Sequence, residues 1–387
     1  MYTKALVVYS LAAAVSSQTL QSVLENQSDT LSSFTQYVTD AGLLDTINGM
    51  GDVTIFAPTN EAFHAVLQTY PDLVNINDSG NSSSTPVSDR LMNILQYHIV
   101  PGAVHELQDF LPYPGSFYPS AYNGIVVNPY VTADNGSAVY SAQKRLSQVN
   151  AADITFDAGI IHTLDQVMLP PTNANVTAYD MGFIYFYGAL QQTDLINDLV
   201  SADQVTLFIP TDQAFIDVGS ALQDISAPDF STIIAFHAVV DNALYTINLS
   251  DSDSLNSLAN TPYEANIDIS VNEDDGALYA NNARVVTPNI LLQNGVAHLI
   301  DQVLNPATEE DNAWTYDLDE DAGEGVPAFE DAASATIPAL TSSISPVPTS
   351  TYSPTATFSA VSGAESPYKQ KVVLASLCAA GLGLLFV

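Results

Sequence analysis

The chain has 387 residues and carries 43 acidic against 7 basic side chains, which gives a formal net charge of −36. No basic face is available to release phosphate counterions, so nucleic acid is excluded as a partner, and adsorption to anionic lipid is equally disfavoured. The single cysteine, Cys378, lies close to the C-terminus, so the rest of the chain has no thiol for catalysis, a disulfide or a metal site.

The N-terminal residues 1–17 are typical of a secretory signal peptide. Lys4 supplies a charged start, an apolar run follows at residues 5–15, and small residues precede Gln18. The apolar run is too short to span a bilayer. We therefore expect a cleaved signal, with a buried N-terminal helix as the alternative.

Two stretches of the chain repeat each other, residues 53–63 and residues 205–215. Each is a run of β-branched and aromatic residues closed by a proline, which predicts a buried strand. The threonine that follows, Thr59 in one copy and Thr211 in the other, is placed to cap a helix. The repeated unit is therefore a strand followed by a capped helix.

Two further blocks recur in the same order downstream. Residues 96–100 match residues 235–239, and residues 159–168 match residues 295–304. The first copy is longer because it carries extra loops rich in Asn, Ser, Gly and Pro. Three ordered blocks, each present twice, indicate two similar domains of ordinary size.

These blocks resemble the fasciclin (FAS1) domain. The resemblance rests on Phe-Ala-Pro-Thr-Asn-Glu-Ala-Phe at residues 56–63, on Tyr97-His98, and on Gly-Ile-Ile-His-Thr-Leu-Asp-Gln-Val-Met at residues 159–168. Each motif has its counterpart in the second copy. That copy departs from the family pattern at Phe236, where the family usually has tyrosine.

The resemblance covers two tandem FAS1-like domains, residues 18–171 and residues 172–306. It implies an α+β fold in which each domain is a β-wedge or sandwich of two small sheets with several short helices. It also implies a role in cell adhesion or matrix contact, with no catalysis and no cofactor.

Six Asn-x-Ser/Thr sequons occur between the signal peptide and the C-terminal region. Together with a signal peptide they favour a glycosylated secretory protein. The predicted glycosylation sites are Asn26, Asn77, Asn81, Asn135, Asn175 and Asn248.

The C-terminal region changes composition twice. Residues 307–362 are first acidic and then rich in Ser, Thr, Ala and Pro, a composition that predicts an extended, O-glycosylated stalk. Residues 363–387 end in an apolar run that follows a short polar spacer, the order of a removed glycosylphosphatidylinositol (GPI) attachment signal. We predict lipid attachment at Ser362 or Gly363, with a tail-anchored membrane helix as the alternative.

Four of the six histidines are paired by the repeat. No His-x-x-x-His or His-Glu-x-x-His spacing occurs, so no metal site is predicted. A histidine in an apolar stretch is usually a core residue hydrogen-bonded to the backbone, although the resemblance also links the Tyr-His segment to adhesion. The family-motif residues, expected to be mostly structural, are Thr59, Tyr97, His98, His162, Thr211, Phe236, His237 and His298.

One dipeptide is a candidate contact for a partner. In animal members of the resembled family, an Asp-Ile pair just before the last block is assigned to integrin contact, and Asp153-Ile154 matches that position. The second domain has Asn289-Ile290 there instead. The alternative is that both isoleucines anchor the core while the Asp or Asn closes a turn.

These observations predict a GPI-anchored, fungal-type cell-surface glycoprotein, on the outer plasma membrane leaflet or the cell wall. Its partners would be an extracellular protein, a polysaccharide or second copies of the same chain, and it would organise matrix or wall without catalysis. One alternative is a polysaccharide- or lipid-binding module that uses exposed aromatic residues. A second alternative is a secreted hydrolase that uses acidic residues. The aromatic candidates are Tyr113, Phe117, Tyr118 and Tyr122.

Overall fold

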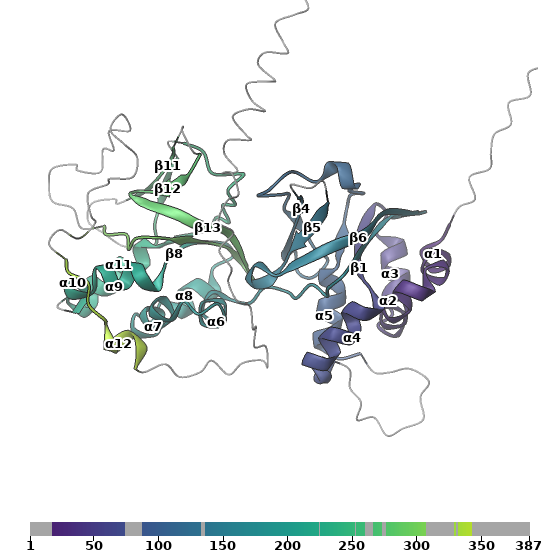
Figure 1. Cartoon of the computed structure of the whole chain (residues 1–387), viewed down its shortest axis with the longest axis horizontal. Coiled ribbons are helices and arrows are strands. Elements are labelled where there is room, and N and C mark those ends of the chain that lie inside the picture. Colours follow the sequence, from purple (N-terminus) through teal and green to yellow (C-terminus); the bar gives the residue numbers. More distant parts are fainter. Residues whose placement is uncertain are drawn as a thin grey trace, which may run out of the picture.

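The computed structural model describes residues 18–73, 87–132, 136–223, 225–251, 253–259, 266–272, 276–306, 329 and 332–342. They form two domains that follow each other along the chain, each with a mixed sheet and several helices (Figure 1). The predicted α+β class is confirmed.

In its described residues the first domain has five α-helices and seven strands. Its sheet has the order β2-β1-β7-β6-β5-β4-β3. The helices are α1 (Leu20–Asn26), α2 (Ser28–Asp40), α3 (Leu43–Gly49), α4 (Asn60–Thr69) and α5 (Asp89–Tyr97), with 3₁₀ turns η1 (Pro71–Leu73), η2 (Leu107–Asp109) and η3 (Ala142–Lys144). The strands are β1 (Val53–Pro58), β2 (Ile99–Pro101), β3 (Tyr118–Pro119), β4 (Val126–Val131), β5 (Ser137–Tyr140), β6 (Leu146–Phe156) and β7 (Gly159–Leu164).

The second domain repeats this arrangement with the strand order β10-β11-β12-β13-β14-β8-β9. Its helices are α6 (Ala174–Asp180), α7 (Ile184–Gln192), α8 (Ile196–Ser201), α9 (Asp212–Asp217), α10 (Gly219–Gln223) and α11 (Ala227–Phe236). The strands are β8 (Val205–Pro210), β9 (Ala238–Val240), β10 (Ser254–Asn256), β11 (Asn266–Val271), β12 (Leu278–Ala280), β13 (Ala283–Leu292) and β14 (Gly295–Ile300).

The repeated apolar stretches form the central strands. Every residue of β1 and of β8 is buried. Each of these strands pairs in parallel with the last strand of its domain, β1 with β7 and β8 with β14. A strand buried on both faces reads as a continuous apolar run, which explains why the sequence signal is strong here. Thr59 and Thr211 lie at the N-caps of α4 and α9 and accept hydrogen bonds from the N–H groups of Ala62 and Ala214.

Each sheet bends at its longest strand. Strand β6 pairs with β7 along most of its length and with β5 at its start, and its pairing with β7 shifts register between Val149 and Ile154. A bulge of this kind bends a strand and increases its twist. One hydrophobic cluster lies under the helices and a second is enclosed by β4, β5 and the central strands. The seven strands of each domain follow one another in a single hydrogen-bonded order, and the bend at the longest strand gives the sheet its wedge shape.

A short C-terminal segment differs from the expectation drawn from composition. Residues 307–362 were predicted to stay extended, but residues 332–342 pack against the second domain and contain a helical turn, α12 (Pro338–Thr341). Ile337 and Leu340 are only 4% and 2% exposed and join the core of that domain. For residues 332–342 the prediction of an extended stalk is therefore wrong, because two apolar side chains in a polar background are enough to dock it.

Several predictions fall outside the described residues. They concern the signal peptide, the tail at residues 363–387, Ser362, Gly363, and the sequons at Asn77, Asn81 and Asn135. Among the residues that the structure does describe, no helix is long and apolar enough to cross a membrane.

Candidate functional site

His98 and His237 occupy equivalent buried positions directly after α5 and α11. The Nδ1–H of His98 donates to the carbonyl of Ile94 (2.7 Å), and its Nε2 accepts from the N–H of Met168 (2.9 Å). His237 makes the same pair of bonds, to the carbonyl of Ile233 and from the N–H of Leu304. Both ring nitrogens are thus used to tie the helix to the chain after the last strand, so neither is free for a metal or a proton transfer.

His162 and His298 form the second equivalent pair, on β7 and β14. The Nε2–H of His162 donates to the carbonyl of His105 (2.8 Å), and that of His298 donates to the carbonyl of Leu244 (2.9 Å). Their Nδ1 atoms face the backbone N–H groups of Asp153 and Asn289. Burial lowers the pKa of both imidazoles, that of His298 to about 4, so they are neutral at neutral pH.

The other family-motif residues also lie in the core. Tyr97 is fully buried, and its hydroxyl donates to the carbonyl of Val126 (2.8 Å). Phe236, at the matching position, is 1% exposed and packs in the apolar cluster of its own domain. The phenol therefore bonds to an outer strand of the first sheet, whereas the second domain places only an apolar ring there.

Asp153 and Asn289 are equivalent residues with left-handed backbone conformations, φ 59° and 57°. Asp and Asn adopt this conformation more readily than most residues. The Oδ1 atom of Asp153 accepts from the N–H of Leu107 (3.0 Å), and that of Asn289 accepts from the N–H of Thr246 (2.9 Å). Each side chain thus holds the loop that precedes the outer strands.

Asp153 and Asn289 differ in how far their side chains are exposed to solvent. The Asp153 side chain is 44% exposed, whereas Asn289 is 0% exposed. The neighbouring isoleucines behave as core anchors to different degrees, since Ile154 is half-buried and Ile290 is fully buried. Of the two predicted contact residues, only Asp153 presents a polar group to solvent.

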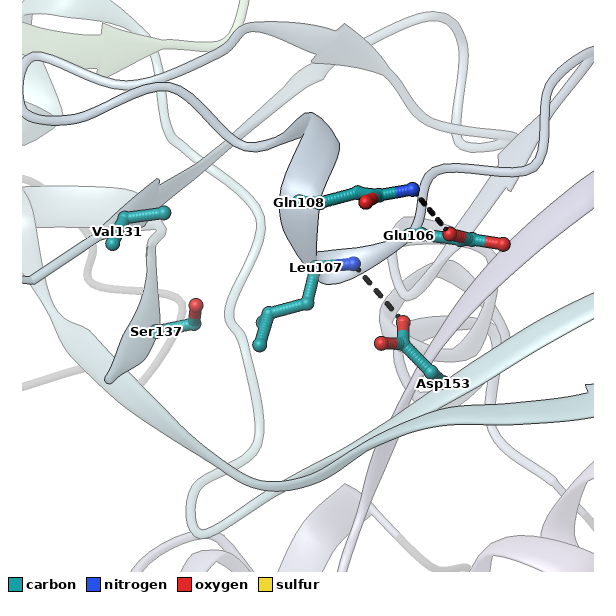
Figure 2. Close-up of a pocket in the computed structure, with 6 residues that line it drawn as sticks. All are labelled: Glu106, Leu107, Gln108, Val131, Ser137 and Asp153. Atoms are coloured by element: carbon teal, nitrogen blue, oxygen red, sulfur yellow. Dashed lines mark hydrogen bonds between the residues drawn. The ribbon is translucent and has the colours of Figure 1, made fainter. Parts of the chain in front are cut away.

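Asp153 lines a cavity of about 350 Å³ in the first domain. Figure 2 shows its carboxylate pointing at the η2 turn, while Leu107 extends between the turn and the strands that carry Val131 and Ser137. Glu106 adds a second carboxylate and accepts from the amide of Gln108 (2.7 Å). The cavity thus combines acidic and amide groups on one side with apolar side chains on the other, a lining suited to a hydroxyl-bearing or basic ligand.

In the second domain the equivalent place is covered by the first domain. The η3 turn packs against β13, and the Nζ atom of Lys144 donates to the carbonyl of Asn289 (3.5 Å). The ammonium lies over the rings of Tyr140 (4.2 Å) and Tyr113 (5.5 Å). Cation–π contacts of this kind gain strength when they are desolvated. Lys144 belongs to no motif, so its role could not be predicted from the sequence.

The aromatic residues proposed as a ligand platform are engaged in packing. Phe117 stacks on Tyr245 of the second domain with ring centroids 4.2 Å apart, and Tyr118 stacks on His105 at 3.7 Å. Tyr113 makes edge contacts with the rings of Tyr130 and Tyr140, and Tyr122 packs against the second cluster of its domain. These rings therefore build the domain interface and the outer strands.

Three sequon asparagines lie in the described part of the chain. Asn26, at the end of α1, and Asn248, in the loop before β10, are exposed. Asn175 lies on α6 and is half-buried, and the hydroxyl of its sequon partner Thr177 faces Thr172. Within the described residues no cluster of three or more His, Cys, Asp or Glu side chains is placed to hold a metal ion.

Comparison with known proteins defines the class. The family model described as the fasciclin domain matches residues 29–170 and 182–306. A fasciclin-like arabinogalactan protein from Arthroderma benhamiae is 30% identical, over 79% of this chain and 69% of that protein. Another, from Cercospora beticola, is 27% identical, over 76% of this chain and 78% of that protein.

The structure of a FAS1 domain pair from the insect cell adhesion molecule fasciclin I is also similar. It is 20% identical, covers 72% of this chain and 97% of its own, and has a TM-score of 0.35. The family match, which spans both domains, decides the classification: the chain belongs to the fasciclin domain family, with two tandem FAS1 domains.

Proposed function

We propose that this chain is a non-catalytic cell-surface glycoprotein whose paired FAS1 domains hold a binding surface for adhesion or for matrix and wall organisation. The main support for the proposal is that the buried histidines shared by the two domains have a structural role. Both ring nitrogens of His98 and His237 are bonded to backbone groups, so these residues maintain the fold. The names of the fungal relatives, fasciclin-like arabinogalactan proteins, agree with a surface role.

The attachment to the surface is part of the same proposal. A signal peptide at residues 1–17, a stalk in residues 307–362 apart from the docked residues 332–342, and a GPI signal at residues 363–387 would display the domains outside the cell. Phosphatidylinositol-specific phospholipase C should release the tagged full-length chain from intact cells, with a mass raised by glycans. Recovery in an internal membrane fraction, with no release, would oppose the anchor.

The cavity beside Asp153 is the proposed contact of the first domain with its ligand. In the second domain the equivalent surface already receives a basic side chain, Lys144, from the first domain. Asp153 adds a negative charge at that position and stays half exposed. We therefore propose that the cavity receives a basic or hydroxyl-bearing group of an extracellular protein or polysaccharide.

We predict that Asp153→Asn weakens binding of the purified chain to its target cells about tenfold or more, because a hydrogen bond to a charged group contributes about 1.5–3 kcal/mol. Asparagine retains the acceptor for the N–H of Leu107 and tolerates the left-handed backbone, as Asn289 does. Asp45→Asn, on the exposed surface of α3, is the matched control. The dissociation constant is measured on intact cells, and equal affinities for both variants would exclude this cavity.

The hydrolase alternative has one supporting observation, since Glu106 and Asp153 line the same cavity. Acid–base catalysis by two carboxylates requires that both reach the substrate. Here Asp153 is bonded to the N–H of Leu107 and Glu106 to the amide of Gln108. Incubation with wall polysaccharides distinguishes a hydrolase from a binding protein. A hydrolase would release sugars as the wild-type chain and fail to do so as the Asp153→Asn variant, whereas a binding protein would release none in either form.

A further inference from the structure

Helix α7 is buried on all sides. All residues from Tyr185 to Leu190 are buried, whereas α2, its counterpart in the first domain, buries only Leu31, Phe34 and Val38 along one stripe. A helix that is apolar all round needs a cover on its second face. The sheet of the second domain supplies one cover, and residues 332–342 supply the other (Figure 1).

We call residues 332–342 the clasp and the surface formed by α7, α9 and α10 the groove. Main-chain hydrogen bonds hold the start of the clasp in the groove, and buried apolar side chains hold its end. Ile337 and Leu340, three residues apart, bury their side chains, and Pro338 opens the helical turn between them. The polar contacts include Ala333 N–H to Ser220 Oγ, Ser220 N–H to Ala333 O, Ala335 N–H to Ile216 O, Ser334 Oγ–H to Asp217 Oδ1, Gln223 Nε2 to Thr336 O and Gln192 Nε2 to Ala339 O.

Two glycines allow the clasp to approach this closely. A Cβ atom on Gly188 would lie 1.9 Å from the carbonyl oxygen of Leu340, and one on Gly219 would lie 1.8 Å from that of Ala335. At both positions the three nearest atoms belong to the clasp. At the position of Gly188 the first domain has Gln36, which is exposed. The groove is thus a property of the second domain alone.

We propose that the groove is a peptide-binding site and that its resident ligand is the chain's own clasp. It fits an extended segment with a small residue at the position of Ala335, followed by two apolar anchors one turn apart. Residues 307–331 join the clasp to the domain, and such a tether keeps the local concentration of the clasp high, so it fills the groove in cis. A peptide of another chain with the same pattern can enter only when the clasp leaves.

Substitution of Gly188 separates the clasp from the rest of the domain. In Gly188→Ala the three atoms nearest to the new methyl group all belong to the clasp, while alanine favours the helix itself. Amide hydrogen exchange at Ala333 and Ala335 should accelerate about tenfold or more, since local opening reports the free energy of docking. Exchange in β14 should stay unchanged. Gly49→Ala, where a Cβ atom meets nothing within 4 Å, is the control and should leave the clasp protected.

Binding in trans tests the groove as a site. In full-length chain carrying Ile337→Asp and Leu340→Asp, a labelled peptide of residues 331–343 should bind saturably, and Gly188→Ala in that background should abolish the binding. The wild-type chain, whose groove is filled, should bind at least about tenfold more weakly. The proposal is overturned if the opened chain binds no peptide, or if Gly188→Ala accelerates exchange in β14 as much as in the clasp, which would make the clasp an inseparable part of the core.

Discussion

The free energy of unfolding should decrease as the pH falls from about 6.5 to about 4. Burial lowers the pKa of His98, His237 and His298 from 6.5 to about 4, with bonds to backbone carbonyls opposing the shift only in part. The unfolded chain then takes up these protons at a higher pH than the folded chain. The stability that depends on neutral imidazole is therefore complete above pH 6.5 and is lost as the pH falls through 4.

The expected size of this effect is large. The difference between 6.5 and about 4 corresponds to about 3 kcal/mol for each histidine once the pH lies below both values. A domain is typically stable by about 5–15 kcal/mol, so the loss of one or two such terms approaches the whole stability. The acidic excess acts in the opposite direction, because protonation of carboxylates relieves their mutual repulsion.

A comparison of variants isolates the histidine contribution. His98→Gln removes one titrating group and should be less stable than the wild type at pH 7, since one of the two buried backbone partners loses its bond. The deficit should shrink as the pH falls to 4, as measured by urea unfolding across this range. His64→Gln, on the exposed face of α4, serves as the control. A deficit that stays constant with pH would contradict the assignment.

Lys144→Glu should separate the two domains. The Lys144 side chain is half-buried between them, its ammonium faces two tyrosine rings and the carbonyl of Asn289, and it lies near the buried His298. A carboxylate at this position would face the same carbonyl dipole and the negative faces of the rings without a partner, which is costly in a buried place. We expect a larger radius of gyration in small-angle scattering, with each domain still folded.

The same lysine makes the interface sensitive to pH. Burial lowers its pKa from 10.5 to about 7. The separated domains would therefore hold the proton up to a higher pH than the docked pair. Docking should strengthen as the pH rises from about 7 towards 10.5, and this lysine should cause no further change below about pH 7.

Lys144→Met keeps the length of the side chain and removes the charge. It should therefore keep the domains docked at every pH in this range, and it is the matched control for Lys144→Glu. Scattering profiles of Lys144→Glu and Lys144→Met that coincide would show that this contact does not hold the pair together.

The parts of the fold that follow from local sequence were predictable. The apolar stretches before Pro58 and Pro210 form central strands because both faces of such a strand are buried, and Thr59 and Thr211 cap the helices that follow. The burial of the paired histidines and their hydrogen bonds to the backbone could be predicted from the apolar residues around them in the sequence. These features depend on residues close together in the chain, where pattern and capping rules apply.

The features that the sequence did not predict depend on contacts between segments that are distant in the chain. Lys144 contacts Asn289 across the domain interface, and nothing in the residues around Lys144 predicts that contact. The same contact explains why Asn289 is buried while its counterpart Asp153 is exposed to solvent. Docking of the clasp could have been predicted from the sequence of α7. This helix is apolar on every face, so a second segment has to cover the face that the sheet does not.

The most direct measurement is the adhesion of host cells that display the full-length chain compared with the same cells that lack it. Attachment to other cells and to isolated matrix or wall is counted under flow, with surface display verified by an antibody to a tag. We predict that display increases attachment and that soluble wild-type chain, but not its Asp153→Asn variant, competes for it. Unchanged attachment of cells with verified display would contradict an adhesive function for the paired FAS1 domains.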